Sequence, residues 1–159
     1  MILYLKRDIS ANAGFVVFDA LSAEKYRVAM PVSGLMPRRK LVVTDTAGRQ
    51  AASIRRLSLA GASVYVIRVG KKHLTLVMLP SAQGMITYFY GCNWRFVGAV
   101  AAKQFSIIDV DKTLILEHRE RADYCELQIP NSSNELVCVA VSVCVNLINT
   151  IDSPALQAV

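Results

Sequence analysis

The sequence lacks the residue patterns that mark most enzymes, metal proteins and membrane spans. It has two histidines and no CxxC pair among its four cysteines, so the spacing of a zinc site is absent. It contains no GxxxxGK or GxGxxG phosphate loop and no GxSxG nucleophile elbow. No uncharged apolar run reaches the ~18–20 residues that a transmembrane helix requires. We therefore expect no metal, no cofactor and no enzymatic activity.

The first residues of this sequence do not have the pattern expected of a targeting segment. Residues 1–5 are apolar, but three charged residues follow at 6–8. A secretory signal needs an apolar stretch of ~7–15 residues, so we expect a cytoplasmic protein. Free cysteines are commonly buried as small hydrophobic residues. Each cysteine lies in an apolar segment and is expected to be a buried free thiol: Cys92, Cys125, Cys138 and Cys144.

What the sequence does contain is enough apolar material for one large core. It has 159 residues, of which 53% are hydrophobic and only 19% charged. Intrinsic disorder is excluded by this composition, and the length suits one domain of ordinary size. We expect a single domain over residues 1–151, followed by a short C-terminal tail at 152–159.

Alternating apolar and polar residues predict many short strands. The alternation is clearest at 26–32, 64–69 and 124–129, and short turn sequences rich in Gly, Asn and Asp separate the runs. Short strands at this regular spacing are typical of a β-sandwich or β-barrel. About twelve strands are expected, at 2–7, 14–19, 24–32, 40–45, 50–58, 63–69, 72–79, 86–90, 95–101, 104–109, 113–119 and 123–129.

A repeated pattern links three of the predicted hairpins. The sequences FVVFD at 15–19, LVVTD at 41–45 and FSIID at 105–109 are each an apolar strand that ends in Asp and leads into a second strand. A carboxylate at the start of a tight turn accepts hydrogen bonds from nearby backbone N–H groups. We therefore interpret the three aspartates as turn caps, not as catalytic acids.

The last apolar segment, at 134–150, has a different character. It contains no Gly or Pro, and the N-cap residues at 131–134 with Glu135 predict a helix start. Because the segment has no polar face, such a helix must be enclosed by the protein. Valines at every second position also suit a buried strand, so this alternative stays open. In a central helix, Val141 and Cys144 would be fully buried.

Together these elements predict a mainly β fold, a closed antiparallel barrel of about twelve strands around a central hydrophobic C-terminal α-helix. A closed barrel encloses a helix on every side and also removes exposed sheet edges. The dimensions agree, because a helix of 13–14 residues and a strand of six residues are both ~20 Å long. Twelve strands leave an interior too wide for strand side chains alone to fill, and the helix would occupy the excess.

The chain resembles the LURP-one-related (YxjI-like) family, which has the tubby C-terminal-like fold. The resemblance covers about residues 1–150 and rests on the order of four features. These are the hairpin sequences from 15–19 through 41–54, YGCNWRFVG at 90–98, FSIID at 105–109, and YCELQI at 124–129, which leads into the hydrophobic helix. Two turns, at 20–22 and 110–112, lack the glycine that the family usually has there.

The resemblance implies a twelve-stranded barrel around the C-terminal helix. It also implies kinship with tubby, whose relatives bind phosphoinositide headgroups, and with phospholipid scramblases. The family offers no catalytic motif to transfer. No residue here matches a lipid-binding motif, so the resemblance assigns no ligand-binding residue.

Charge is the best surface signal for function. Residues 1–80 contain 13 Lys and Arg against 4 Asp and Glu, whereas residues 81–159 contain 5 against 8. Clustered basic charge is sufficient for binding an anionic lipid headgroup or membrane surface, although solvated strand faces would look the same. Nucleic-acid binding would need exposed aromatic residues or a recognition helix, and we expect none. The candidate ligand-binding residues are Arg38, Arg39, Lys40, Arg55, Arg56, Lys71 and Lys72.

Three functional hypotheses follow. The first is a non-enzymatic binding module for an unknown ligand, with anionic lipid or a membrane surface as the favoured partner. The second is a scaffold for an unknown protein partner, and the third is a cryptic enzyme with a cleft at the barrel rim. His73 and His118 have no Ser or Cys nucleophile near them in the sequence, and Trp94 is interpreted as an anchor in the barrel wall.

Overall fold

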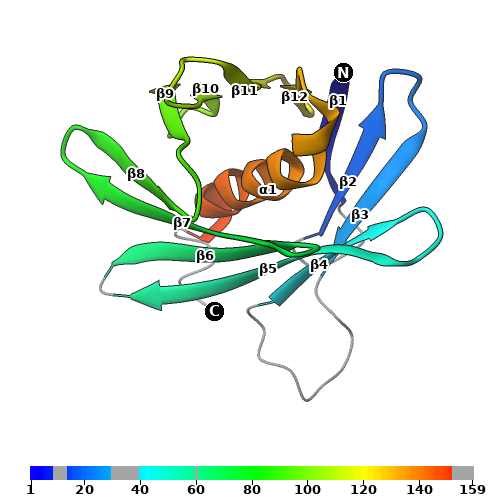
Figure 1. Cartoon of the computed structure of the whole chain (residues 1–159), viewed down its shortest axis with the longest axis horizontal. Helices are drawn as coiled ribbons and strands as arrows, with labels where there is room; N and C mark the ends of the chain where they lie inside the picture. Colours follow the sequence, from blue (N-terminus) through cyan, green and yellow to red (C-terminus); the bar gives the residue numbers. More distant parts are fainter. Residues whose placement is uncertain (9–13, 30–39, 60, 152–159) are drawn as a thin grey trace.

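The computed structural model describes residues 1–8, 14–29, 40–59 and 61–151. Its elements are twelve strands, one 3₁₀ turn and one helix, and Figure 1 shows the strands surrounding the helix. The strands are β1 (Ile2–Asp8), β2 (Gly14–Asp19), β3 (Glu24–Ala29), β4 (Lys40–Asp45), β5 (Gln50–Leu59), β6 (Ala62–Val69), β7 (Lys72–Ser81), β8 (Gly84–Tyr90), β9 (Arg95–Ala99), β10 (Gln104–Ile108), β11 (Leu114–Glu120) and β12 (Cys125–Gln128).

All twelve strands form one antiparallel sheet that curls into a barrel. Its order is β8-β7-β6-β5-β4-β3-β2-β1-β12-β11-β10-β9, so strands that follow each other in the sequence pair, with the exception of β8 and β9, and β1 also pairs with β12. The predicted antiparallel barrel of twelve strands is confirmed. The barrel is nearly closed. Its one gap within the described residues lies between β8 and β9, which no ladder joins.

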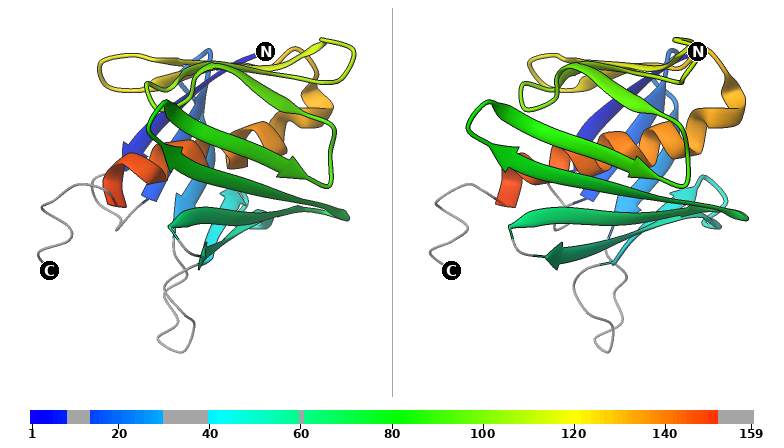
Figure 2. Two further views of the ribbon diagram at one scale, coloured as in Figure 1. Left: turned by 90° about the vertical axis from the view of Figure 1, so that its left-hand side faces the viewer. Right: turned by 60° about the vertical axis from the view of Figure 1, so that its left-hand side comes forward.

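The helix α1 (Glu135–Ile151) lies inside the barrel and follows the 3₁₀ turn η1 (Ser132–Asn134). Figure 2 shows the helix running between the strands in two further views. The residues from Val137 to Leu147 are all buried, including Val141 and Cys144 at zero exposure. The alternative of a buried strand for this segment is therefore wrong. Among the described residues, no helix is long and apolar enough to cross a membrane.

The start of α1 is held by a capping side chain that precedes it and by side chains of β3. Asn131 accepts a hydrogen bond from the backbone N–H of Ser133, which caps the 3₁₀ turn. Glu135 forms an ion pair with Lys25 and accepts a hydrogen bond from the Tyr26 hydroxyl at 3.0 Å. Burial and the Glu135 carboxylate raise the pKa of Tyr26 above its usual range. These contacts attach the helix to β3.

The three repeated aspartates cap turns in the same way. In each hairpin one Asp oxygen accepts hydrogen bonds from the backbone N–H groups two and four residues later, all at 2.9–3.0 Å. The third residue after each Asp has a positive φ: 63° at Ser22, 78° at Gly48 and 63° at Lys112. The predicted capping role is confirmed, and Ser22 and Lys112 adopt this backbone conformation without being glycine.

The core combines α1 with the inward side chains of the strands. Cys125, Cys138 and Cys144 are buried in it, whereas Cys92 is only half-buried, and all four are free thiols. Burial raises the pKa of Cys138 to about 12. Trp94 is partly buried against the core and makes an edge-on contact with Phe89, so it anchors the connection between β8 and β9 to the core.

Candidate functional site

The predicted basic residues fall into separate places on the barrel. Arg38 and Arg39 lie outside the described residues, so their positions are not placed by the structure. Lys40 on β4 stands directly opposite Arg55 on β5. Both are on the outer face, because their neighbours Leu41 and Ile54 are buried in the core. Like charges directly opposite each other destabilise a sheet, and an anionic ligand would relieve this repulsion.

Arg56 does not belong to this outer surface, which corrects the prediction that it would. It is paired with Tyr65 on β6, and Tyr65 is paired with Leu76 on β7. Tyr65 and Leu76 have zero exposure and point into the barrel. Side chains alternate between the two faces of a strand, so the consecutive residues Arg55 and Arg56 must point to opposite faces.

The turn between β6 and β7 carries Lys71 and Lys72 at one end of the barrel. Lys72 lines a rim pocket of about 310 Å³ together with His73, Gly91 and Trp94. A further basic residue, Arg68, links this end to the outer face. It is exposed and lies opposite Ser53, two residues from Arg55 on the same side of β5. Sequence analysis missed Arg68 because it stands alone and not in a basic cluster.

Next to the basic residues, the outer face of β6–β8 is apolar. Arg55 is followed across the sheet by Val66, Thr75 and Tyr90 in one row. The following rows end in Tyr88 and Ile86 on β8. Tyr88 is 55% and Tyr90 62% exposed, so the expectation of no exposed aromatic residues is wrong. The outer patch, as we call it, consists of basic Lys40, Arg55 and Arg68 and apolar Val66, Val77, Leu79, Ile86, Tyr88 and Tyr90.

Apart from Lys40, the outer patch belongs to a long stretch of sequence without acidic residues. Between Asp45 and Asp109 the sequence has no Asp or Glu, while it has eight Lys and Arg. Among the described residues no ion pair involves Arg55 or Arg68; within this stretch only Arg49 and Lys103, near its two ends, have acidic partners. This gap in the positions of the acids is the sequence signal that would have located the patch.

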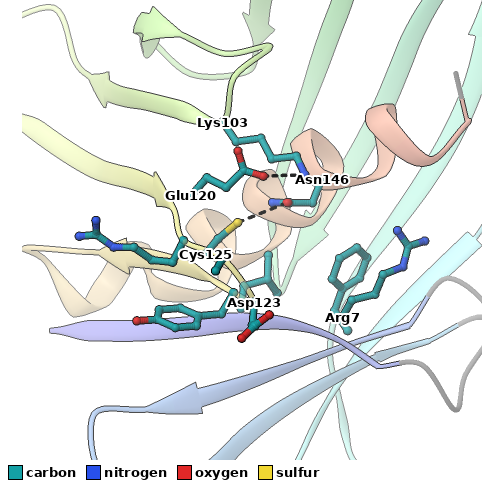
Figure 3. A pocket seen from close by; sticks show the side chains of 11 residues that line it. Arg7, Lys103, Glu120, Asp123, Cys125 and Asn146 are labelled. Atoms are coloured by element: carbon teal, nitrogen blue, oxygen red, sulfur yellow. Dashed lines mark hydrogen bonds and ion pairs between the residues drawn. The ribbon is translucent and has the colours of Figure 1, made fainter. Parts of the chain in front are cut away.

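A second candidate is a smaller pocket at the rim near the β11–β12 turn (Figure 3). Its volume is about 160 Å³, and its lining includes both charged and core residues. Lys103 and Glu120 form an ion pair of 3.5 Å across it. Asn146, from α1, accepts a hydrogen bond of 3.4 Å from the Cys125 thiol. The pocket therefore contains a cysteine, and through Asn146 it is connected to His118.

The hydrogen bonds around His118 determine which of its nitrogens carries the proton. Nδ1 lies 2.8 Å from the Lys103 carbonyl oxygen, so Nδ1–H must donate. Nε2 is then an acceptor for the Asn146 side-chain amide, which lies 3.2 Å away and also donates to the Ser142 carbonyl oxygen. Burial lowers the pKa of His118 to about 4. Stacking on Phe105 holds the neutral ring in place.

This network resembles a cysteine nucleophile site in composition but not in geometry. The Cys125 thiol donates to Asn146 and not to His118, so no base is positioned to take its proton. Burial also raises the pKa of the Cys125 thiol. The arrangement keeps the thiol protonated and the imidazole neutral, which is what a buried structural network needs. Within the described residues, no cluster of three His, Cys, Asp or Glu side chains suits a metal ion.

The comparisons with known proteins bear on the fold alone. No protein-family model matches the sequence, and no curated protein matches it. The structure is similar to the X-ray structure of the Arabidopsis thaliana protein AT5G01750, with a TM-score of 0.63 at 15% sequence identity. The match covers 93% of this chain and 90% of that chain. A likeness at this level of identity assigns no residue a role.

Proposed function

We propose that the protein is a non-enzymatic binding module that associates with anionic lipid surfaces through the outer patch. The observation that carries this proposal is the juxtaposition of Lys40, Arg55 and Arg68 with exposed Tyr88 and Tyr90 on one acid-free face. Exposed apolar patches next to charge mark interaction sites. Tyrosine is also enriched where proteins meet the polar region of a bilayer, because its ring is apolar and its hydroxyl is polar.

The expected strength of this association follows from its charge. Each basic residue near an anionic membrane contributes about 1 kcal/mol, and the attraction falls off within a Debye length. Lys40, Arg55 and Arg68 together with Lys71 and Lys72 at the adjacent turn would contribute about 4–5 kcal/mol. Binding at this level is weak and depends on ionic strength. It matches a cytoplasmic protein that visits a membrane surface reversibly.

We also propose that the chain belongs to the LURP-one-related (YxjI-like) family. The similarity of its fold to AT5G01750 over most of both chains supports this. So do the places of three of the four sequence features that carry the resemblance. FVVFD, LVVTD and FSIID form the first strands of the three Asp-capped hairpins, and YCELQI includes β12, which leads into the helix.

We assign no reaction to the smaller pocket near the β11–β12 turn. Its only thiol, Cys125, has no base beside it, and its pKa is raised by burial. The pocket volume of about 160 Å³ is also smaller than the ~300–1,000 Å³ of ordinary ligand sites. Both observations argue against a reaction in the pocket that Cys125 lines.

Flotation with liposomes tests the proposal. The full chain should float with phosphatidylserine-containing vesicles at low salt, and raising the salt to physiological strength and above should progressively release it. The double variant Arg55→Glu/Arg68→Glu should bind at least about 30-fold more weakly, because it replaces two attractive charges by two repulsive ones. Both side chains are exposed, so the variant should keep the native melting temperature.

The matched control is Lys6→Glu/Lys112→Glu, which makes the same change in net charge elsewhere. Lys6 and Lys112 are exposed, and they lie on β1 and in the β10–β11 turn. This control should retain most of the binding. Equal binding to neutral and anionic vesicles, or equal losses in the two double variants, would contradict a specific role of the outer patch and leave the scaffold hypothesis ahead.

A further inference from the structure

Among the described strands, one consecutive pair has no ladder between its members. β8 and β9 follow each other in the sequence, yet they are the two ends of the strand order. Figure 2 shows them diverging from their connection at residues 91–94. Each strand therefore has one edge without a ladder partner among the described residues, and β8 is the longer of the two.

The connection itself prevents a simple hairpin. Gly91 has a φ of 92°, and a Cβ added there would lie 2.6 Å from the His73 carbonyl oxygen on β7. Only glycine allows the chain to turn this close to the β7 backbone. Across the opening, Phe89 of β8 and Phe96 of β9 stack with their ring centroids 5.0 Å apart. Aromatic side chains thus cover the core at the place where backbone hydrogen bonds would otherwise close the wall.

The free edge of β8 carries none of the features that usually protect an exposed strand. Its sequence, GMITYFY, has no charged residue and no proline, and its ladder with β7 has no register shift. Natural edges are commonly blunted by Lys, Pro, bulges or short length. A seven-residue uncharged strand with exposed Ile86 and Tyr88 is a ready template for pairing with another strand.

We propose that the β8 edge binds the β8 edge of a second copy of this chain, as an antiparallel pair about a two-fold axis. Full overlap of the two strands places Thr87 opposite Thr87 of the second copy. It also places Ile86 opposite Tyr88 of the second copy, twice by symmetry, on the outer face. Aromatic residues opposite β-branched residues are favourable cross-strand pairs. An isologous contact of this kind closes at two copies.

The distribution of charge selects the antiparallel arrangement. Lys72 and Arg95 lie near the Tyr90 end of β8, on β7 and at the start of β9. The other end is the β7–β8 hairpin at 81–84, which has no charged residue. An antiparallel pair places the basic end of one copy beside the neutral hairpin of the other. A parallel pair would place the two basic ends side by side, where they would repel each other.

This inference does not depend on lipid binding, although the two are compatible. Pairing at β8 would join the outer patches of two copies into one continuous surface. The contact is small, because it involves one strand from each copy, so the dimer should dissociate on dilution. Sedimentation equilibrium of the full chain, without vesicles, measures this directly. At about 100 μM the mass should approach twice 17.5 kDa, and it should fall toward the monomer on dilution.

Three variants make the test specific. Ile86→Lys and Tyr88→Glu should each be monomeric at the same concentration, because each places like charges close to each other at the axis. An equimolar mixture of the two should recover dimers, since Lys at 86 then faces Glu at 88. Thr75→Lys is the control: it adds the same charge on the outer face of β7, one strand from the edge, and should still dimerise.

Circular dichroism would establish that the variants remain folded. A native chain that stays monomeric at about 100 μM overturns the proposal. Dimers that persist in Ile86→Lys place the contact elsewhere, and a mixture that stays monomeric excludes the proposed register. None of these outcomes bears on flotation with liposomes, so this inference and the proposed function can fail separately.

Discussion

Two walls of the barrel differ in their content of acidic residues. The acid-free wall, β5–β10, contains no Asp or Glu. The acid-bearing wall, β11, β12 and β1–β4, contributes the carboxylates of the ion pairs, with the helix residue Glu135. The hairpins differ as well. Turns within β5–β8 rely on glycines with positive φ, whereas the Asp-capped turns all involve at least one strand of the acid-bearing wall.

This difference shows that surface charge has to be summed over strands that are neighbours in the barrel, and not over halves of the sequence. Dividing the sequence at residue 80 gives a basic first half, but that half includes β1–β3, where Asp8 and Glu24 accompany Arg27. The uniformly basic region begins after Asp45 and ends before Asp109. The strands of this region, β5–β8 and β9–β10, lie at the two ends of the sheet, and these ends meet at the opening between β8 and β9.

The two walls share one core if they unfold together. Val141→Asp tests this, and it is expected to cause the largest loss of stability of the variants considered. Val141 has zero exposure in α1, and the helix packs on β5 and β6 as well as on β1 and β11. An unpaired buried carboxylate costs several kcal/mol, which is comparable to a total stability of ~5–15 kcal/mol. Trp94 fluorescence and far-UV circular dichroism should therefore report loss of both walls together.

The control for that experiment is Val110→Asp, at a turn residue that is 68% exposed. It introduces the same side chain and should change stability by less than about 0.5 kcal/mol. A Val141→Asp protein with a native melting temperature would show that α1 is not the shared core of the two walls.

A second test concerns His118, which couples β11 of one wall to Phe105 of the other. Burial lowers its pKa from 6.5 to about 4 in the folded protein. Between these values the unfolded chain binds a proton that the folded chain does not, so the free energy of unfolding falls as the pH falls. About 3 kcal/mol should be lost between pH 7 and pH 4, and the contribution of this group should level off below pH 4.

Urea unfolding at several pH values measures this slope. His118→Phe keeps an aromatic ring but cannot titrate, so the difference between the two proteins isolates the histidine from the carboxylates that titrate nearby. The stability of the variant should be lower at pH 7 and should fall less between pH 7 and pH 4. Parallel pH profiles in the two proteins would mean that His118 titrates normally in the folded state.

The third test sharpens the contrast in ion pairing. Glu135→Gln removes the charge that pairs with Lys25 and weakens the hydrogen bond from Tyr26, and it should cost about 1 kcal/mol. Arg55→Gln on the acid-free wall removes a charge that faces Lys40. It should leave stability within about 0.5 kcal/mol or raise it slightly. Denaturant titration of the two variants compares them, and equal losses would contradict the difference between the walls.

The smallest expected effect concerns the Asp-capped turns. Lys112 has a φ of 63°, a conformation that costs a residue with a Cβ about 1–2 kcal/mol. Lys112→Gly removes this strain but increases the freedom of the unfolded chain, so a net gain of about 0.5 kcal/mol is expected. Asp111→Gly, at the preceding residue without positive φ, should lower stability instead. Thermal melts of the two variants should shift in opposite directions.

Much of the fold was predictable because local patterns determined it. Strand alternation, the turn residues and the Asp caps all act over fewer than about ten residues, so the sequence displays them directly. The register shift before each capping Asp was not predicted, although it occurs in all three hairpins. Nor was the opening between β8 and β9, because it depends on a close approach of Gly91 to the β7 backbone.

The candidate site was less predictable for a geometric reason. Clustering in the sequence suggested Arg55 and Arg56 as a pair, yet neighbouring residues of a strand point to opposite faces. The isolated Arg68 joined the outer patch through pairing across β5 and β6. His118 appeared to lie in a charged strand, but Leu114, Leu116 and His118 alternate, and this alternation already indicated an inward imidazole.

The route by which the sheet closes has a kinetic consequence. Among the residues that the structure describes, every ladder except one joins strands that follow each other in the sequence, so β1–β8 and β9–β12 can each assemble from local hairpins. The exception joins Leu5 to Cys125 and their neighbours. Bringing ends about 120 residues apart together costs about 4 kcal/mol of chain entropy before any contact repays it. The meeting of β1 with β12, and not the formation of any hairpin, should therefore set the folding rate.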